Sequence, residues 1–299
     1  MPTELRELKQ RIGSTVQIRR VTSTLQRVAA ARLARDRRAI ENSRRYLEEL
    51  ARVLQAAHAA APAARHPLMA ARPAGACCLV IFGADRGLCG GFTTGLMEEL
   101  GRFAGGAGRG PLQLVVMGKI AERRTRRAGH GIARACRQAP VSYIAPGAGA
   151  EAGTPAGLAE MGRVAGFVTD GFLEGRYGEV HLLYAKFVSA LRQQALVKPL
   201  LPLALPPHPS PRFRAALLEP DAERILARVA PEFVERSLYD AFINSLGSEN
   251  AARQLAMSRA TENAGELLEE LVIGYRRMRQ DSITAEMIEL FGGEGAATE

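Results

Sequence analysis

The sequence contains no tryptophan, and aromatic residues make up only 5% of its 299 residues. None of its four cysteines stands in a C-x-x-C pair, and its five histidines are scattered without ligand spacing, so neither disulfides nor a metal site is expected. No apolar stretch approaches the roughly 20 residues that a membrane-spanning helix needs, and the start MPTELRELKQ has no signal-peptide core. Any membrane association is therefore expected to depend on partner proteins.

The sequence is also poor in lysine, although its formal net charge is +9. The only lysines are Lys9, Lys119, Lys186 and Lys198, so arginine carries nearly all of the positive charge. A basic excess of this size predicts an acidic partner surface, which nucleic acid, anionic lipid or an acidic protein would offer. A codon bias towards arginine, alanine, glycine and proline explains part of the excess equally well. The hydrophobic fraction of 47% places the chain among globular proteins.

The amino-terminal segment lacks helix breakers. No proline occurs between Pro2 and Pro62, and Gly13 is the only glycine before Gly75, so one long helix is predicted over residues 3–58. Apolar residues are spaced by three or four at Ile18, Val21, Leu25 and Val28, and then by seven at Leu33, Ile40, Leu47 and Leu54, with Leu50 between them. A seven-residue repeat keeps a narrow stripe against a partner helix and favours a left-handed supercoil.

A second long helix is predicted in the carboxy-terminal third. Pro231 suits the first position of a helix that runs to Phe291 and stops at Gly292 and Gly293, and Pro220–Val229 is predicted as a short separate helix. The apolar stripe of the long helix from Pro231 comprises Met257, Ala260, Ala264, Leu268, Leu271, Tyr275 and Met278. Neither terminal helix can bury its stripe alone, so the two are predicted to pack on each other as an antiparallel coiled coil.

The middle of the chain has a different pattern of apolar residues. Short apolar runs of strand type occur at Cys77–Phe82, Leu112–Met117 and Val180–Tyr184, and helical stretches at 94–104 and 155–173 alternate with them. Such alternation predicts an α/β domain with a mainly parallel sheet. The predicted organisation is a coiled-coil helix at 1–60, a Rossmann-like α/β domain at 74–210, and a coiled-coil helix at 218–292.

A glycine-rich loop, D-R-G-L-C-G-G at Asp85–Gly91, directly follows the first predicted strand. It matches neither the dinucleotide fingerprint nor the phosphate-binding P-loop, so a tight structural turn is favoured over a nucleotide site. Cys89 within it could be a nucleophile, but no histidine lies near it in sequence, and a structural thiol is favoured. No other pattern of catalytic residues stands out.

Several segments resemble the gamma subunit of F-type ATP synthase. They are the opening L-R-E-L-K-Q-R-I, the V-A-A-A-R-L of Val28–Leu33, the loop Asp85–Gly91, S-E-N-A-A-R at Ser248–Arg253, and R-Q-D-S-I-T-A-E at Arg279–Glu286. The run Y-A-K-F-V-S from Tyr184 is similar to the family's last strand. The chain departs from the family at 23–27, where S-T-L-Q-R replaces a Lys-Ala-Met-Lys-Met type stretch, and residues 105–175 carry little resemblance.

The resemblance implies a non-catalytic central-stalk rotor subunit with no cofactor and no metal. Its expected partners are the alpha and beta subunits of the catalytic head, an epsilon-type subunit and the membrane c-ring, and the complex is expected on the cytoplasmic side of a bacterial inner membrane. The implied subunit contacts are Arg253, Arg279, Gln280, Thr284 and Glu286. The implied stalk-base loop comprises Asp85, Arg86, Gly87, Cys89, Gly90 and Gly91.

Two other classes of function stay open at this point. One is an enzyme with a nucleotide site in the α/β domain. The other is an arginine-rich coiled-coil protein that binds nucleic acid, although the arginine clusters, such as Arg123–Arg127 and Arg276–Arg279, lack the interleaved aromatic residues that stack on bases. On the long helices, these clusters fit an acidic protein collar better than nucleic acid.

Overall fold

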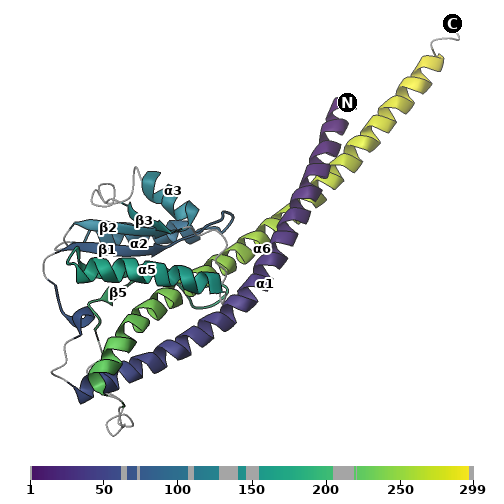
Figure 1. Ribbon diagram of the computed structural model, residues 1–299. Helices are drawn as coiled ribbons and strands as arrows, with labels where there is room; N and C mark the ends of the chain where they lie inside the picture. The colour runs from purple at the N-terminus through teal and green to yellow at the C-terminus, as the bar shows by residue number, and fades with distance from the viewer. Residues whose placement is uncertain are drawn as a thin grey trace. The chain divides into compact units, whose positions relative to one another are not determined.

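A computed structural model describes residues 2–61, 66–72, 75–106, 111–127, 141–145, 155–204, 219 and 221–295. The elements in chain order are α1 (Pro2–Ala60), a 3-10 turn η1 (Pro67–Met69), β1 (Ala76–Phe82), α2 (Phe92–Ala104), β2 (Leu112–Met117), α3 (Lys119–Arg127), β3 (Val141–Ala145), α5 (Pro155–Leu173), β4 (Tyr177–Phe187), β5 (Gln193–Leu201) and α6 (Ala222–Gly295) (Figure 1).

The chain divides into two compact units. Unit 1 is built from Met1–Ala29 and Gln254–Glu299, and unit 2 from Ala30–Arg253, so that α1 and α6 contribute to both. The division into three segments at 1–60, 74–210 and 218–292 stays a prediction. Among the helices in the described ranges, none combines the length and the apolar character needed to cross a membrane.

Unit 2 contains a five-stranded sheet with the order β3-β2-β1-β4-β5. β1 is parallel to both of its neighbours, β2 is parallel to β3, and β5 is antiparallel to β4. The predicted mainly parallel sheet is therefore confirmed, and with it the mixed α/β class. Every residue of β1 is buried, which explains its continuous apolar sequence, because helices cover a parallel sheet on both faces.

Two strands, β3 and β5, were not predicted. β5 is an edge strand, and its polar residues Gln193, Gln194 and Lys198 interrupt the apolar run that marks a central strand. Edge strands commonly carry such side chains, because a charged or polar edge resists pairing with other chains. A search for apolar runs therefore finds the centre of this sheet and misses its edge.

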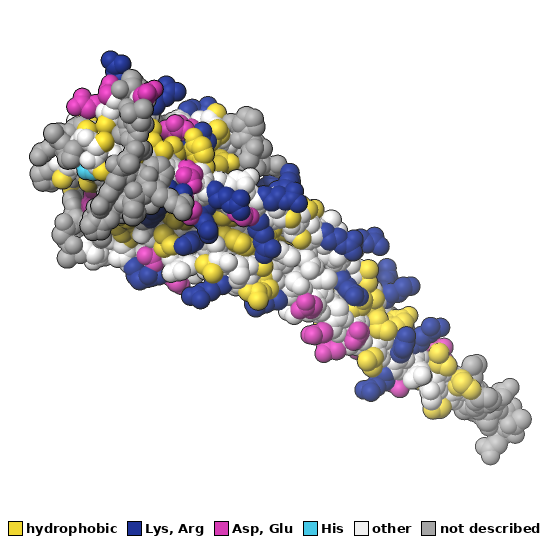
Figure 2. Space-filling view, turned by 90° about the horizontal axis from the view of Figure 1, so that it is seen from below, with side chains coloured by type: hydrophobic (Ala, Val, Ile, Leu, Met, Phe, Trp, Pro, Cys, Tyr) yellow, Lys and Arg dark blue, Asp and Glu magenta, His cyan; other side chains and the backbone are white. Residues whose placement is uncertain are grey.

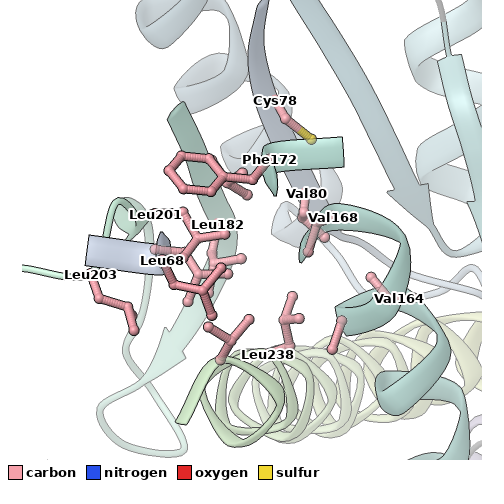
Figure 3. Packing of buried hydrophobic residues seen from close by; sticks show 14 of the residues in the cluster. Leu68, Cys78, Val80, Val164, Val168, Phe172, Leu182, Leu201, Leu203 and Leu238 are labelled. Atoms are coloured by element: carbon pink, nitrogen blue, oxygen red, sulfur yellow. The ribbon is translucent and has the colours of Figure 1, made fainter. Parts of the chain in front are cut away.

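One face of the sheet is covered by α5 and the first part of α6. Val168 and Phe172 of α5, Leu238 of α6 and Val80 of β1 are fully buried in one cluster (Figure 3). Leu54 of α1 belongs to the same cluster. Burying a side chain of this size contributes about 1.5–3 kcal/mol. The first part of α6 is thus held to the sheet by its apolar side chains.

The opposite face of the sheet is covered by α2 and α3. Leu96 and Leu100 of α2 and Ala121 of α3 pack with Leu79 and Ile81 of β1. These β1 residues alternate with the ones that face α5, as expected for a strand with a period of two. Unit 2 is therefore a sheet between two helical layers.

The course of α6 differs from the prediction in two places. The helix begins at Ala222 and runs through Pro231, which neither starts a helix nor separates one from another. A proline inside a helix costs about 3 kcal/mol, but the buried residues Ala230 and Val234 on either side pack against the sheet and hold the backbone helical. The helix also continues past the predicted glycine stop at Gly292 and Gly293 to Gly295.

In unit 1, α1 and α6 run antiparallel, as predicted. Thr261 Oγ1 donates to Thr22 Oγ1 at 2.8 Å, and Gln26 Nε2 donates to Ser258 Oγ at 3.4 Å, so residue numbers rise on one helix as they fall on the other. The two helices lie side by side in Figure 1. The stripe predicted on α6 faces inward, since its members are buried or half-buried.

The predicted inward stripe of α1 is only partly correct. In unit 2, Leu33 and Leu54 of the seven-residue repeat are buried, as is Leu50. In unit 1, however, Ile18, Val21 and Val28 are exposed, and smaller residues such as Thr15, Thr22 and Ala29 face the partner helix. A contact lined by small residues lets two helices approach closely, and it leaves the large apolar residues on the outer surface.

Candidate functional site

A row of buried polar residues on α6 contacts the carboxyl ends of β1 and β4. Ser245 Oγ donates to the carbonyl oxygen of Phe82 at 2.6 Å, and Ser248 Oγ donates to that of Ala185 at 2.9 Å. Both serines are almost completely buried. Strand carbonyls at a sheet end need such donors when water is excluded, so this part of α6 is fixed in register on the two strands.

One turn further along α6, Arg253 binds the loop that follows β1. Its Nε donates to the carbonyl oxygen of Gly87 and its terminal nitrogen to that of Arg86, each at 3.3 Å. The same guanidinium forms an ion pair with Glu249 and donates to Asn250 Oδ1 at 2.9 Å. Arg253 thus uses the several donors of its planar group to join two backbone carbonyls to its own helix.

Glu249 is the acidic partner in this cluster. Burial raises the pKa of its carboxyl above the ordinary value of 4.5, while Arg253 and the backbone N–H groups of Arg86 and Asp85 act in the opposite direction. Both residues therefore bind the loop: Arg253 donates hydrogen bonds to its carbonyl oxygens, and Glu249 accepts hydrogen bonds from its backbone N–H groups. Only 10% of the Arg253 side chain and 7% of the Glu249 side chain are exposed.

Asn250 extends the cluster to α1. Its Nδ2 donates to Asp36 Oδ2 at 2.6 Å, and both residues are buried. The polar cluster of Asp36, Glu249, Asn250 and Arg253 therefore joins three segments that are far apart in the sequence, namely α1, the loop after β1, and α6. We refer to these four residues, with Ser245 and Ser248, as the α6 polar cluster.

The loop itself has the tight geometry predicted from its glycines. Leu88 and Gly90 have positive φ angles of 65° and 54°, and the side chain of Leu88 is 61% exposed. Asp85 Oδ1 accepts a hydrogen bond from the backbone N–H of Lys119 at 3.3 Å. Gly91 stands at the N-cap of α2. The loop residues from the sequence analysis are thus brought together with Arg253.

Cys89 lies within this loop but is not set up as a nucleophile. It is 5% exposed, and burial raises the pKa of its thiol. Its sulfur lies 3.8 Å from the carbonyl oxygen of Arg86 and 3.8 Å from Thr93 Oγ1. A nucleophilic cysteine needs a stabilised thiolate, and this environment has the opposite effect, in agreement with a structural thiol.

The α6 polar cluster occupies the place where doubly wound α/β folds bind nucleotides. Such folds hold their ligand at the carboxyl ends of the strands where the strand order reverses. In this sheet the reversal falls between β1 and β4, and Ser245 and Ser248 of α6 bind the carboxyl ends of these two strands. Helix α6 therefore covers the carboxyl ends of these two strands.

The remaining predicted contact residues belong to unit 1, whereas the α6 polar cluster belongs to unit 2. Arg279, Gln280, Thr284 and Glu286 are all exposed on α6. Thr284 Oγ1 donates to the carbonyl oxygen of Gln280 at 2.9 Å, and Glu286 accepts from Ser282 Oγ at 3.4 Å. Arg253, predicted with them, instead makes its hydrogen bonds within unit 2. Their role as subunit contacts stays a prediction.

Sequence reasoning missed the role of Asp36, Ser245, Glu249 and Asn250. The last two belong to the S-E-N-A-A-R segment, but the sequence does not show that they are buried. The available signal is the set of polar residues on one side of α6, at Ser245, Ser248, Glu249 and Arg253, in a helix with many apolar inward positions. No comparable signal marks Asp36, whose partner lies more than two hundred residues away.

The ionisation of Glu249 is expected to make stability depend on pH. Because its pKa is raised in the folded state, the folded chain binds more protons than the unfolded chain between the ordinary and the raised pKa. Stability therefore falls as pH rises through this window. We expect Glu249→Gln to weaken this fall of the free energy of unfolding with pH, measured by urea unfolding at several pH values, while Glu223→Gln, at an exposed position of α6, leaves it unchanged. Burial also raises the pKa of Asp240, so part of the pH dependence remains. If the free energy of unfolding changes with pH equally in the wild type and in Glu249→Gln, the raised pKa of Glu249 does not contribute to stability.

Comparison with known proteins reveals similarity along nearly the whole chain. A profile of the protein family described as ATP synthase matches residues 4–297. The chain is 32% identical over 292 residues to the ATP synthase gamma chain of Desulforamulus reducens, covering 97% of this chain and 98% of the relative. It is 34% identical over 307 residues to the ATP synthase gamma chain of a Parafrankia species, covering 99% and 98%.

Solved structures with a similar fold come from rotary complexes. A chain in the cryo-EM structure of Euglena gracilis mitochondrial ATP synthase, with OSCP, F1 and c-ring in rotational state 3, matches with a TM-score of 0.64 at 15% identity, covering 99% of this chain and 95% of that one. A chain of the central stalk and c-ring of the Tetrahymena thermophila mitochondrial ATP synthase matches with a TM-score of 0.56 at 20% identity, covering 80% and 99%. At identities of 15% and 20%, the similarity to these two chains shows a shared fold and nothing more.

Proposed function

The chain belongs to the ATP synthase gamma chain family, and from this membership we infer that it is the central-stalk rotor subunit of an F-type ATP synthase. It couples transmembrane ion flow to ATP synthesis or hydrolysis by rotating inside the catalytic head. The chain itself is not catalytic; the nucleotide sites belong to the head. The middle segment is a Rossmann-like domain inserted between two helices of a coiled coil.

The observation that carries this proposal is the outer surface of unit 1. Large apolar residues are exposed there on both helices, among them Ile18 and Val21 on α1 and Ile273, Ile283 and Ile288 on α6. Basic and hydrophobic side chains lie interspersed along the long helices (Figure 2). Extended apolar surface of this kind marks a protein interface, and a paired helix inside a collar of other subunits would be covered on all sides.

The mechanism follows from asymmetry. A single pair of helices presents different side chains on its different faces, so it contacts equivalent subunits around it unequally. Each rotational position then stabilises a different conformation of each surrounding subunit, because a contact shifts a conformational equilibrium only by its differential affinity. Rotation of this chain therefore cycles every catalytic site through its states.

The α6 polar cluster supports the transmission of torque. Torque that enters through the α/β segment must reach α6 without slippage, and the buried ion pair and the serine hydrogen bonds fix α6 to two strands and one loop. Buried, fully satisfied polar networks specify one arrangement of the elements that they join. The cluster therefore acts as a rigid joint in place of a ligand site.

The partners are the alpha and beta subunits of the head, an epsilon-type subunit and the c-ring, in a complex on the cytoplasmic side of a bacterial inner membrane. An open groove of about 800 Å³ beside the loop after β1 fits a contact at the stalk base. It is lined by the exposed Leu88 and by Arg123, Arg124 and Arg127 of α3, so it suits a partner that is acidic with an apolar anchor.

Affinity purification tests the proposal. A tagged chain, expressed in cells that contain the other subunits, is expected to co-purify with the alpha and beta subunits and to support ATP-driven ion pumping in membrane vesicles. A chain that purifies alone and instead binds duplex DNA, with an affinity that falls steeply with salt, would point to the nucleic-acid alternative. Nucleotide binding by the purified chain in calorimetry would favour an enzyme.

The exposed residues near the end of α6 are expected to contact the head. Gln280→Ala and Thr284→Ala should each lower the coupled ATPase rate by about fivefold, since one hydrogen bond is worth about 1 kcal/mol. Both side chains are exposed within the chain, so thermal unfolding of the isolated chain should not change. Gln194→Ala, an exposed glutamine on β5, is the matched control. Full coupled activity in both α6 variants would remove these residues from the contact.

A further inference from the structure

The sheet of unit 2 brings together three side chains that can ligate a metal ion. Cys77 on β1 pairs with Glu179 on the adjacent parallel strand β4, and His181 follows two residues later on the same strand. Because side chains two residues apart lie on the same face of a strand, Glu179 and His181 lie on one face of β4. The pairing register places Cys77 beside them.

The three ligand atoms are close to one another. The sulfur of Cys77, one ring nitrogen of His181 and one carboxylate oxygen of Glu179 all lie within 4.8 Å of each other. His181 Nε2 lies 2.9 Å from Glu179 Oε2. With metal–ligand bonds of about 2.0–2.3 Å, these atoms are close enough for small side-chain movements to place them around a single ion.

The surroundings of the cluster are those of a site with one open side. Cys77 is 1% exposed, whereas the side chains of His181 and Glu179 are 13% and 38% exposed. The ring of Phe103, near the end of α2, lies 5.0 Å from the His181 ring and forms an apolar wall. The thiol is therefore at the protected end of the cluster, and the carboxylate faces the entry from solvent.

The local backbone also distinguishes this position. The pairing between β1 and β4 shifts its register between Ala76 and Cys77, and such irregularities often re-aim a side chain. The cluster lies at the beginning of β1 and β4, whereas the α6 polar cluster binds the carboxyl ends of the same strands. The two sites are therefore separate, and the cluster does not depend on the proposed rotor function.

We propose that Cys77, Glu179 and His181 form a binding site for a divalent ion of the zinc class. One thiolate, one imidazole and one carboxylate are a ligand set that suits Zn²⁺ and Co²⁺ and disfavours Mg²⁺ and Ca²⁺, which prefer oxygen ligands. The fourth tetrahedral position is left to water. Binding releases the thiol proton of Cys77 to solvent, and the ion cross-links β1 to β4.

The spacing of ligands along the sequence does not reveal this site, and none was predicted. Cys77 and the E-x-H pair at 179–181 are more than one hundred residues apart. Sequence patterns for zinc depend on pairs of cysteine or histidine at short separations, and only the parallel pairing of β1 and β4 brings this thiol to the imidazole.

Cobalt spectroscopy on the reduced full-length chain tests the proposal. Titration with Co²⁺ is expected to saturate at one ion per chain, with a thiolate-to-cobalt charge-transfer band and the intense visible bands of a tetrahedral ion, and Zn²⁺ should displace it. Cys77→Ala should abolish the charge-transfer band and weaken binding by more than about tenfold. Cys78→Ala is the matched control, because the neighbouring cysteine packs in the cluster on the other face of the sheet and should leave the spectrum unchanged.

Two further variants test the site in case Cys77→Ala fails to fold. His181→Asn and Glu179→Gln alter half-buried side chains and are expected to retain the native circular dichroism spectrum while binding Co²⁺ more than about tenfold more weakly. Zn²⁺ should raise the melting temperature of the wild type and of Cys78→Ala but not that of Cys77→Ala. The proposal is overturned if the wild type shows no thiolate band, or if the band persists in Cys77→Ala.

Discussion

Replacing Arg253 by methionine is expected to lower the free energy of unfolding by about 3–5 kcal/mol, because it leaves the buried carboxylate of Glu249 without its cationic partner. The same change removes the hydrogen bonds to the carbonyl oxygens of Arg86 and Gly87. Chemical unfolding of the full-length chain measures the loss. In the assembled complex, ATP-driven ion pumping should fall more than ATP hydrolysis, since the joint that carries torque to α6 is weakened.

Two comparisons separate this effect from a general loss of an arginine. Arg228→Met, at an exposed position of the same helix, should change the free energy of unfolding by less than about 0.5 kcal/mol. The double variant Glu249→Gln/Arg253→Met should be more stable than Arg253→Met alone, because the uncompensated charge is gone. If Arg228→Met and Arg253→Met destabilise equally, or the double variant is the least stable, the α6 polar cluster does not act as described.

The local features of this fold could be predicted from the sequence because they depend on local rules. β1 is a continuous apolar run and β2 is apolar apart from Gln113, as buried parallel strands require. The lack of proline after Pro2, with Gly13 as the only glycine, marks α1 as one helix. The inward face of α6 in unit 1 follows its apolar spacing. Pairing of the terminal helices was predicted from apolar stripes on both, but in unit 1 only the α6 stripe faces inward.

The features that were missed depend on contacts between distant segments. Pro231 was predicted to start a helix, but α6 runs through it, because its neighbours pack against the sheet and keep the helix continuous. Ile18 and Val21 were predicted to contact α6, yet both are exposed in unit 1. The prediction failed because an apolar stripe does not reveal which partner covers it. The α6 polar cluster was not predicted, because buried polar residues cannot be told from surface residues until their partners are known.

The close approach of the β1 and β2 ends is expected to make Gly118, like Gly75, one of the least replaceable glycines in the described part of the chain. Its φ angle is +98°, and a Cβ at this position would lie 2.4 Å from the carbonyl oxygen of Gly83 and 2.8 Å from that of Ala84. Ala84 also accepts the backbone N–H of Ile120 at 3.0 Å, so the start of α3 cannot move away without breaking this bond. Backbone strain and a clash with backbone atoms therefore act together.

Gly118→Ala should consequently lower the free energy of unfolding by about 3 kcal/mol or more, and the variant chain should fail to co-purify with the head subunits at elevated temperature. Gly166→Ala is the matched control, because this glycine lies in α5 with open space around its Cβ position, and alanine should stabilise the helix by about 0.5–1 kcal/mol. The two identical substitutions are thus expected to differ in sign. A neutral Gly118→Ala would show that the loop after β1 and the start of α3 can separate, and the anchoring of that loop would then rest on Arg253 and Glu249 alone.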